Sequence, residues 1–146
     1  MARYLRNKIF HRIIDANINR TKEGLRVLEE ITRFVLNSRG LTSKFKTLRH
    51  SINKALTKLP PSTALIKERE SLKDIGKNIY VNELKRKNIG DIFSANIQRA
   101  KESLRVLEEF SKLINKDAAV AFKKIRYEIY GLEKEAVKKI SRLYKK

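Results

Sequence analysis

The chain contains an internal repeat, and this repeat limits the possible folds more than any other feature of the sequence. The segment Ala16–Ile31 recurs as Ala95–Phe110, and only four positions differ between the two copies. A fainter similarity follows each copy, because Lys44–His50 resembles Ala121–Tyr127. Self-similarity of this kind indicates a fold made of two copies of one supersecondary unit.

Apolar residues recur at helical spacing in both copies, so each repeat is predicted to form a helical hairpin. The helices are expected over about 11–36, 42–58, 91–114 and 117–143, and the sequences at 37–40 and 60–61 are typical of helix ends. Thr42 and Asp117 are the predicted N-caps. Two such hairpins predict an all-α four-helix bundle with a pseudo-twofold axis.

This bundle is predicted to be one helical domain over residues 1–146, with repeat one at about 11–58 and repeat two at about 91–143. A linker over about 59–90 joins the repeats and is expected to hold a short helix near 62–68. A connection of this length is more often functional or disordered than inert. The linker is therefore a candidate part of any binding site.

The chain carries a formal net charge of +19, which attracts polyanions such as nucleic acid or phosphorylated metabolites. A lysine-rich solvated surface explains the same charge without such a partner, because the lysines are spread along the helices. The absence of cysteine excludes disulfides, thiol nucleophiles and zinc–thiolate sites. No apolar run approaches the roughly 20 residues of a membrane span, so we expect a cytoplasmic protein without membrane contact.

The repeated motif places polar groups where a bundle helix needs apolar ones. At about 100° per residue, Asn17, Arg20 and Gly24 fall in the middle of the stripe that faces the core. Buried polar side chains are costly unless they are paired. Glycine inside a helix costs about 1 kcal/mol relative to alanine, which the close approach of another helix or of a ligand would offset.

Two interpretations of these polar groups stay open. In the first, Arg20 pairs with Glu102 and Arg99 pairs with Glu23 across the axis, which makes a closed buried network. In the second, the motif lines a cavity for an anionic, hydrogen-bonding small molecule. Arginine presents a planar fork to phosphate, and asparagine offers both a donor and an acceptor.

A second set of candidates lies in the fainter part of the repeat. Arg49 and its counterpart Arg126 each follow a predicted core residue, and His50 and Tyr127 come next. These four residues either border the same cavity or lie on the rim of the bundle. The other histidine, His11, has no metal-ligand spacing to His50, so no histidine-bound metal is predicted.

Two further groups are assigned from local spacing. Arg26, Glu29 and Glu30 are expected on the outer face of their helix, where the spacing of Glu23, Arg26 and Glu30 predicts a surface ion-pair ladder. Asp74 lies in a Lys-Asp-Ile-Gly turn of the linker, where two roles stay open. A plain turn explains the residue, and so does a carboxylate ligand for a hard cation such as Mg²⁺.

Several separate segments between residues 11 and 134 resemble one known family. They are Asp15–Glu30, Leu48–His50, Arg69–Gly76, the second Ala95-Asn96 copy, and Phe122–Tyr130 with Leu132-Glu133. The resemblance is to the small helical domain fused ahead of thiamine-phosphate synthase in some bacteria, a family assigned as a hydroxymethylpyrimidine phosphate kinase. Glu70 stands where that family usually has aspartate, which alters the geometry of any metal bound there.

The resemblance implies an ATP- and Mg²⁺-dependent phosphotransferase of thiamine biosynthesis. It would convert 4-amino-5-hydroxymethyl-2-methylpyrimidine phosphate to its diphosphate, a reaction that needs mainly positioning and charge neutralisation. For this reaction we hypothesise that Glu23, Glu102 and Asp74 are the catalytic residues and that Asp74 is also the Mg²⁺ ligand. The hypothesised substrate-binding residues are Asn17, Arg20, Arg49, His50, Arg69, Asn96, Arg99, Arg126 and Tyr127.

The alternative is a non-catalytic helical module. Such a module would bind nucleic acid, a thiamine-phosphate synthase or a second copy of itself. Only the net charge of +19 favours nucleic acid, and the sequence has no RNA-binding motif and few aromatic residues placed for base stacking. The oligomeric state and the ligand of each repeat stay open.

Overall fold

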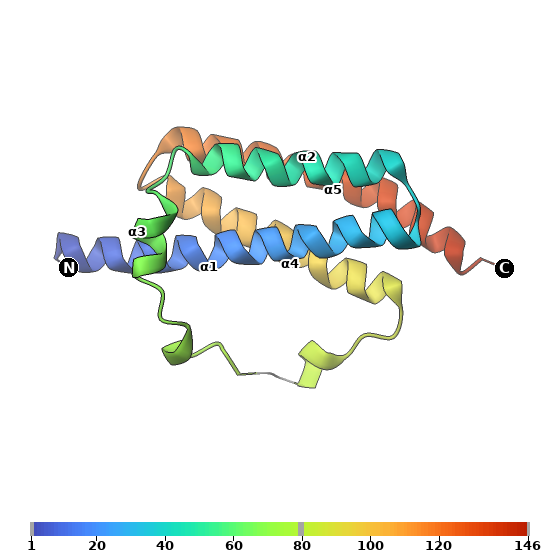
Figure 1. The fold of residues 1–146 in the computed structure, drawn as a ribbon, viewed down its shortest axis with the longest axis horizontal. Helices are drawn as coiled ribbons and strands as arrows, with labels where there is room; N and C mark the ends of the chain where they lie inside the picture. Colours follow the sequence, from blue (N-terminus) through green and yellow to red (C-terminus); the bar gives the residue numbers. More distant parts are fainter. Residues whose placement is uncertain (1, 79–80, 146) are drawn as a thin grey trace.

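The computed structural model describes residues 2–78 and 81–145, and within these ranges it contains helices and their connections without strands. The long helices are α1 (Arg3–Glu30), α2 (Arg39–Leu56), α4 (Ile89–Ser111) and α5 (Lys116–Leu143) (Figure 1). The all-helical prediction is therefore confirmed. Among the described residues, no helix is both long enough and apolar enough to cross a membrane. Residues 79 and 80 of the predicted linker lie outside the described ranges.

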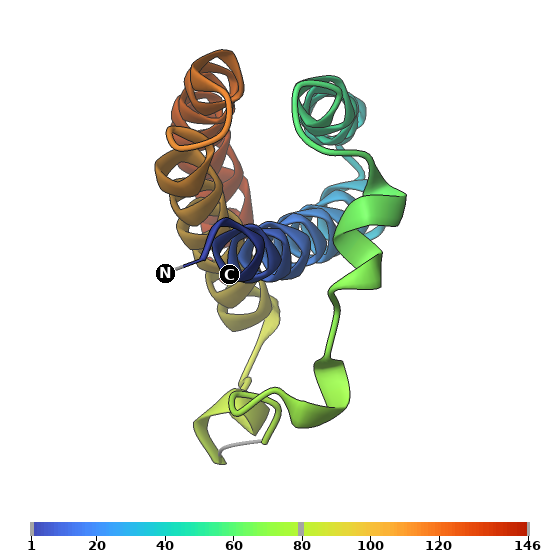
Figure 2. The same cartoon turned by 90° about the vertical axis from the view of Figure 1, so that its left-hand side faces the viewer.

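The helices form two antiparallel hairpins, α1 with α2 and α4 with α5, as the repeat predicted. The most extensive packing joins α1 to α4, and α2 and α5 lie on the same side of that pair (Figure 2). Contacts also join α4 to α5, α5 to α2 and α2 to α1. Both repeats therefore contribute to one core.

Apolar side chains from all the long helices fill this core. In α5 the apolar stripe is buried from Phe122 to Leu132, whereas Val137 beyond it is 47% exposed. Ala136 and Ile140 are buried instead, because at about 100° per residue they continue the stripe that leads to Leu132. The largest fully buried side chains are Phe45, Phe93 and Phe122.

The first hairpin turns where the sequence predicted a helix end. α1 runs directly into one π-helical turn, Ile31–Val35, and Asn37 then adopts a left-handed φ of 48°. The backbone N–H of Ser38 bonds to the carbonyl of Thr32 at 2.9 Å. Asparagine tolerates this conformation better than most residues and commonly ends a helix in this way.

The starts of α2 and α5 differ from the predictions because their capping side chains lie earlier in the chain. Ser38, not Thr42, caps α2 and accepts a hydrogen bond from a backbone N–H of the first turn at 3.3 Å. Asn115, not Asp117, caps α5 and accepts two such bonds at 2.9 and 3.2 Å. In both cases the residue at the true start has extended backbone, which an N-cap requires.

Small residues let α1 and α4 approach closely at their crossing. A Cβ atom at Gly24 would lie 3.1 Å from the backbone oxygen of Asn96 in α4. Close by, the hydroxyl oxygens of Thr21 and Ser103 are 2.6 Å apart and both residues are buried. Of the two explanations that the sequence left open for Gly24, another helix or a ligand, the structure shows the close approach of another helix.

The linker passes beneath the α1–α4 pair, on the side away from α2 and α5 (Figure 1). It contains the short helix α3 (Ser62–Lys67) near the predicted position, followed by the short turns η2 (Ser71–Lys73) and η3 (Val81–Leu84). We call residues 69–78 the strap. Its first two residues bind α1, through Arg69 on Asp15 and Glu70 on Lys8.

Candidate functional site

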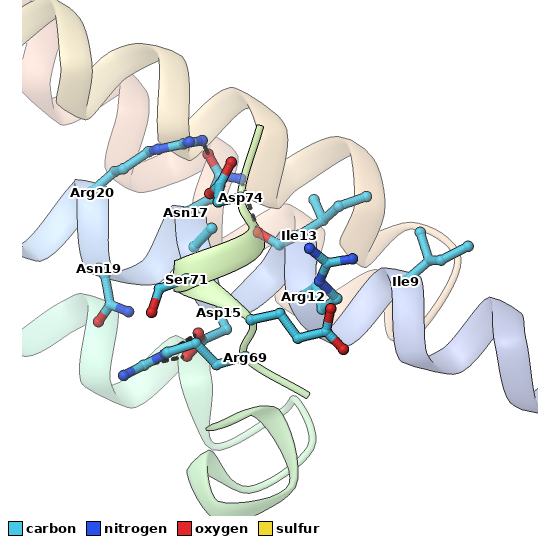
Figure 3. A pocket seen from close by; sticks show the side chains of 12 residues that line it. Ile9, Arg12, Ile13, Asp15, Asn17, Asn19, Arg20, Arg69, Ser71 and Asp74 are labelled. Carbon is cyan, nitrogen blue, oxygen red and sulfur yellow. Dashed lines mark hydrogen bonds and ion pairs between the residues drawn. The ribbon is translucent and has the colours of Figure 1, made fainter. Parts of the chain in front are cut away.

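A cavity of about 430 Å³ lies between α1 and the strap (Figure 3). Its α1 wall includes Asn17, Asn19 and Arg20, and its strap wall includes Ser71 and Asp74. We call it the strap cavity. Residues of the repeated motif and residues of the linker line this one cavity, although the sequence indicated them as two separate candidate sites.

A second cavity of about 650 Å³ adjoins the first and lies where α1 faces α4. We call it the interhelical cavity. It shares Asn17 and Arg20 with the strap cavity, and its other walls include Arg99, Glu102 and Lys77. The two motif arginines, which are equivalent in the repeats, therefore line one cavity.

Asn17 forms the wall between the two cavities and is 4% exposed. Its amide nitrogen donates to the carbonyl oxygen of Ile13 at 2.8 Å, and its amide oxygen accepts a long 3.4 Å bond from Arg20 (Figure 3). Its counterpart Asn96 donates in the same way to Ile92 at 2.8 Å. Asn96 is only half-buried and lines neither cavity.

Arg20 and Arg99 are both exposed, and in the described part of the chain neither forms a salt bridge. The closed network of the first interpretation is therefore not formed. Glu102 lines the interhelical cavity and accepts a bond from Gln98 at 3.1 Å. Glu23 is exposed and lines neither cavity.

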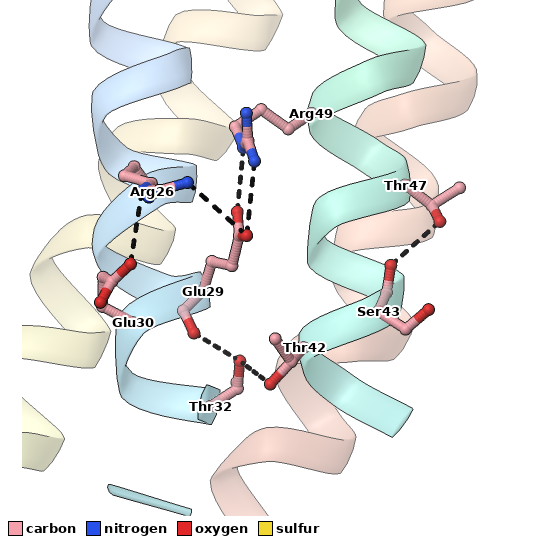
Figure 4. Close-up of polar contacts among 8 residues, drawn as sticks. All are labelled: Arg26, Glu29, Glu30, Thr32, Thr42, Ser43, Thr47 and Arg49. Atoms are coloured by element: carbon pink, nitrogen blue, oxygen red, sulfur yellow. Dashed lines mark hydrogen bonds and ion pairs between the residues drawn. The ribbon is translucent and has the colours of Figure 1, made fainter. Parts of the chain in front are cut away.

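The other predicted phosphate-binding arginines are held by buried carboxylates. Arg49 donates to both oxygens of Glu29 at 2.9 and 3.3 Å (Figure 4). Arg126 donates twice to Glu108 at 2.9 and 3.3 Å, which repeats the pair in the second hairpin. Both ion pairs join the two helices of a hairpin, and neither arginine lines the strap or interhelical cavity.

These pairs correct the prediction that Glu29 lies on the outer face. Glu29 is 6% exposed and its counterpart Glu108 is 4% exposed. Arg26 of the predicted ladder bridges Glu30 at 3.3 Å, and it also lies 3.7 Å from the buried carboxylate of Glu29 (Figure 4). The motif contains two adjacent glutamates, and only packing against the second helix selects the first of them for burial.

The environment of Arg126 keeps its guanidinium charged. Burial opposes the charge, but hydrogen bonds from Arg126 to Glu108 and Tyr130 outweigh it, so the pKa of Arg126 is raised. The predicted binding residue Tyr127 is 59% exposed and packs edge-on against Tyr130. His50 is exposed on α2 and lines neither cavity. The rim interpretation therefore fits both residues better than the cavity interpretation.

Arg69 lines the strap cavity but is already paired. It donates two 2.7 Å bonds to Asp15, and the hydrogen bonds and charge of that carboxylate raise the pKa of Arg69 (Figure 3). The next residue, Glu70, lies 3.3 Å from Lys8, whose hydrogen bond and charge lower the pKa of Glu70. Sequence analysis missed the role of Asp15 and Lys8, because only the fold brings them to the strap.

Asp74 lies at the strap cavity, where its carboxylate accepts a bond from the Gly76 backbone N–H at 2.8 Å. This is the plain turn that the sequence allowed. Within the described ranges there is no group of three or more His, Cys, Asp or Glu side chains placed to hold a metal ion. The Mg²⁺ role of Asp74 stays a prediction.

Comparisons with known proteins agree on one family. The ThiD2 family model matches residues 12–135. A thiamine-phosphate synthase of Nostoc punctiforme is 39% identical over 127 residues, which are 86% of this chain and 35% of the relative. Those of Rhodopirellula baltica and a Synechocystis species are 36% and 38% identical, over 90% and 84% of this chain. No solved structure matches the chain at a significant level.

The chain spans about a third of the length of these curated relatives. The expectation of a hydroxymethylpyrimidine phosphate kinase is wrong on this comparison, because the relatives carry the name thiamine-phosphate synthase and not that of a kinase. The expected connection to the thiamine pathway is confirmed. The family match over most of its length shows that this chain belongs to the ThiD2 family.

Proposed function

We propose that this chain binds the phosphorylated aminopyrimidine of thiamine biosynthesis and acts beside a thiamine-phosphate synthase. The observation that carries the proposal is the pair of adjoining cavities at the repeated motif. Arg20 and Arg99 line the same cavity, and no salt bridge neutralises either of them among the described residues. Two cations that face one space favour an anionic ligand there.

The lining also suits the rest of such a ligand. Asn17, Asn19 and Ser71 offer amide and hydroxyl groups at the strap cavity, and an aminopyrimidine presents both donors and acceptors to such groups. A cavity of about 430 Å³ is within the usual size range for small-molecule sites. The buried side chain of Asn17 is held by two hydrogen bonds, so this part of the wall is preorganised.

The partner in the proposal comes from the relatives. Their printed name is thiamine-phosphate synthase, and they are about three times as long as the segment that they share with this chain. A helical domain that keeps a pyrimidine phosphate close to a synthase would raise the local concentration of that pathway intermediate near the synthase. Analytical ultracentrifugation of the chain with a separately expressed synthase tests the partnership.

Ligand binding is tested by calorimetry and thermal unfolding with 4-amino-5-hydroxymethyl-2-methylpyrimidine phosphate in about 0.3 M NaCl, where exposed charges are well screened. At a ligand concentration 100 times Kd, the expected stabilisation is about 2.7 kcal/mol. For a chain of this size that raises Tm by roughly 8 °C.

The matched variants are Arg20→Met, which removes a cavity cation, and Arg142→Met, which removes an exposed cation of α5. We expect Arg20→Met to abolish the Tm rise and Arg142→Met to leave it unchanged. Equal loss in both variants, or binding of RNA in place of the pyrimidine phosphate with a steep salt dependence, would contradict the proposal.

A further inference from the structure

The two cavities differ in their free charges. In the strap cavity the formal charges of the lining balance, because Arg69 is bonded to Asp15, Glu70 lies near Lys8 and Arg12, and Asp74 offsets the charge of Arg20. Apart from Arg20 and Asp74, the polar groups left for a ligand there are neutral. In the interhelical cavity Arg20 and Arg99 carry charges without a salt bridge in the described part of the chain, and Lys77 of the strap adds a third cation.

The carboxylates of the interhelical cavity offset this charge only in part. Glu102 is an exposed side chain that accepts a hydrogen bond from Gln98 at 3.1 Å, and Glu83 is exposed as well. Three cations against two exposed carboxylates leave a local excess of positive charge. An arginine pair with this excess suits a phosphoryl group better than a neutral ring.

The two repeats also carry different amide side chains at the two cavities. Asn19 of the first repeat lines the strap cavity, and its counterpart Gln98 lines the interhelical cavity. Gln98 is engaged with Glu102, whereas Asn19 makes no side-chain hydrogen bond within the described ranges. An amide without an internal partner at a cavity wall is available to a polar ring.

We infer that a single ligand spans both cavities, with its phosphoryl group between Arg20 and Arg99 and its ring in the strap cavity against Asn19 and Ser71. Asn17 lies at the junction, because it and Arg20 are the residues that line both spaces. This inference rests on the proposed function and adds the orientation of the ligand. It makes Arg99 a phosphate-binding residue and Asn19 a ring-binding residue.

The experiment compares two ligands with two variants. The ligands are the pyrimidine phosphate and its unphosphorylated alcohol, and the variants are Arg99→Met and Asn19→Ala, with Arg142→Met as the charge control. Loss of a charged hydrogen bond weakens binding by about tenfold to a hundredfold. We expect Arg99→Met to raise the Kd of the pyrimidine phosphate by this factor and to leave the Kd of the alcohol unchanged.

Asn19→Ala should weaken the binding of the phosphate and of the alcohol equally, because both ligands carry the ring. Inorganic phosphate should displace the pyrimidine phosphate from the Asn19→Ala variant. It should no longer displace the pyrimidine phosphate from the Arg99→Met variant. Arg99 is exposed and Asn19 is only half-buried, so both variants are expected to fold, and circular dichroism checks this.

The orientation is overturned if wild type binds both ligands but Arg99→Met weakens the alcohol as much as the phosphate. It is equally overturned if Asn19→Ala affects the phosphate alone. Absence of any binding by the wild type instead overturns the proposed function, and the orientation with it. The two failures are therefore distinguishable from the wild-type measurement.

Discussion

Replacing Arg49 by methionine separates a structural arginine from a ligand-binding one. The side chain of Glu29 is only 8% exposed and that of Arg49 is 25% exposed. Two hydrogen bonds join them at 2.9 and 3.3 Å. In Arg49→Met the carboxylate stays buried and retains one weaker cation, Arg26, at 3.7 Å.

The magnitude follows from this geometry. Removing one partner of a fully buried ion pair costs about 3–5 kcal/mol. Arg49 is a quarter exposed and Arg26 remains nearby, so solvent and the second cation reduce the cost to about 2 kcal/mol. With a urea m-value of about 1.5 kcal/mol/M, the unfolding midpoint should fall by roughly 1.3 M.

The assay is urea unfolding followed by circular dichroism at neutral pH. Lys46→Met, an exposed change on the same helix, is the charge control and should leave the midpoint unchanged. The double variant Arg49→Met with Glu29→Leu removes both charges and should recover most of the lost stability, because an apolar pair of similar volume often replaces a buried ion pair without loss. The affinity of Arg49→Met for the pyrimidine phosphate should equal that of the wild type.

The reasoning is refuted if Arg49→Met keeps its unfolding midpoint and loses ligand affinity. Arg49 would then contact the ligand, as the sequence-based hypothesis held. A double variant that is less stable than Arg49→Met would refute the assignment of the destabilisation to the unpaired carboxylate of Glu29.

Three further predictions concern the bundle and the strap. Gly131→Ala in α5, where a Cβ meets nothing within 4 Å, should raise the free energy of unfolding by about 0.8 kcal/mol. Gly24→Ala should lower the free energy of unfolding, because the new Cβ would lie 3.1 Å from a backbone oxygen. Urea unfolding checks both variants. The pKa of Glu70 is lowered from 4.5, so the contact with Lys8 persists above that pH and is lost as the pH falls through the lowered value. In a carbon-13 NMR titration of Glu70, Lys8→Met should therefore move the midpoint back towards 4.5. Asn115→Ala should cost about 1 kcal/mol in the same unfolding assay, because it removes the N-cap of α5.

The sequence by itself determined the helical hairpins and their duplication. Helical spacing and the repeat are local properties, and the cost of glycine inside a helix indicated that another helix or a ligand approaches Gly24. The family resemblance led to the thiamine pathway, which the comparisons confirm, and to a kinase, which they contradict. The helix starts were displaced because Ser38 and Asn115 precede the residues that were expected to be caps.

Only the tertiary structure decided which arginines are available to a ligand. Arg20 and Arg49 have the same chemistry in the sequence, but packing of α2 on α1 buries Glu29 against Arg49 and leaves Arg20 at a cavity. Likewise, Arg69 meets Asp15 only because the linker folds back beneath α1. A guanidinium group binds whichever anion the fold brings near it, and that depends on contacts between distant segments that spacing along one helix does not encode.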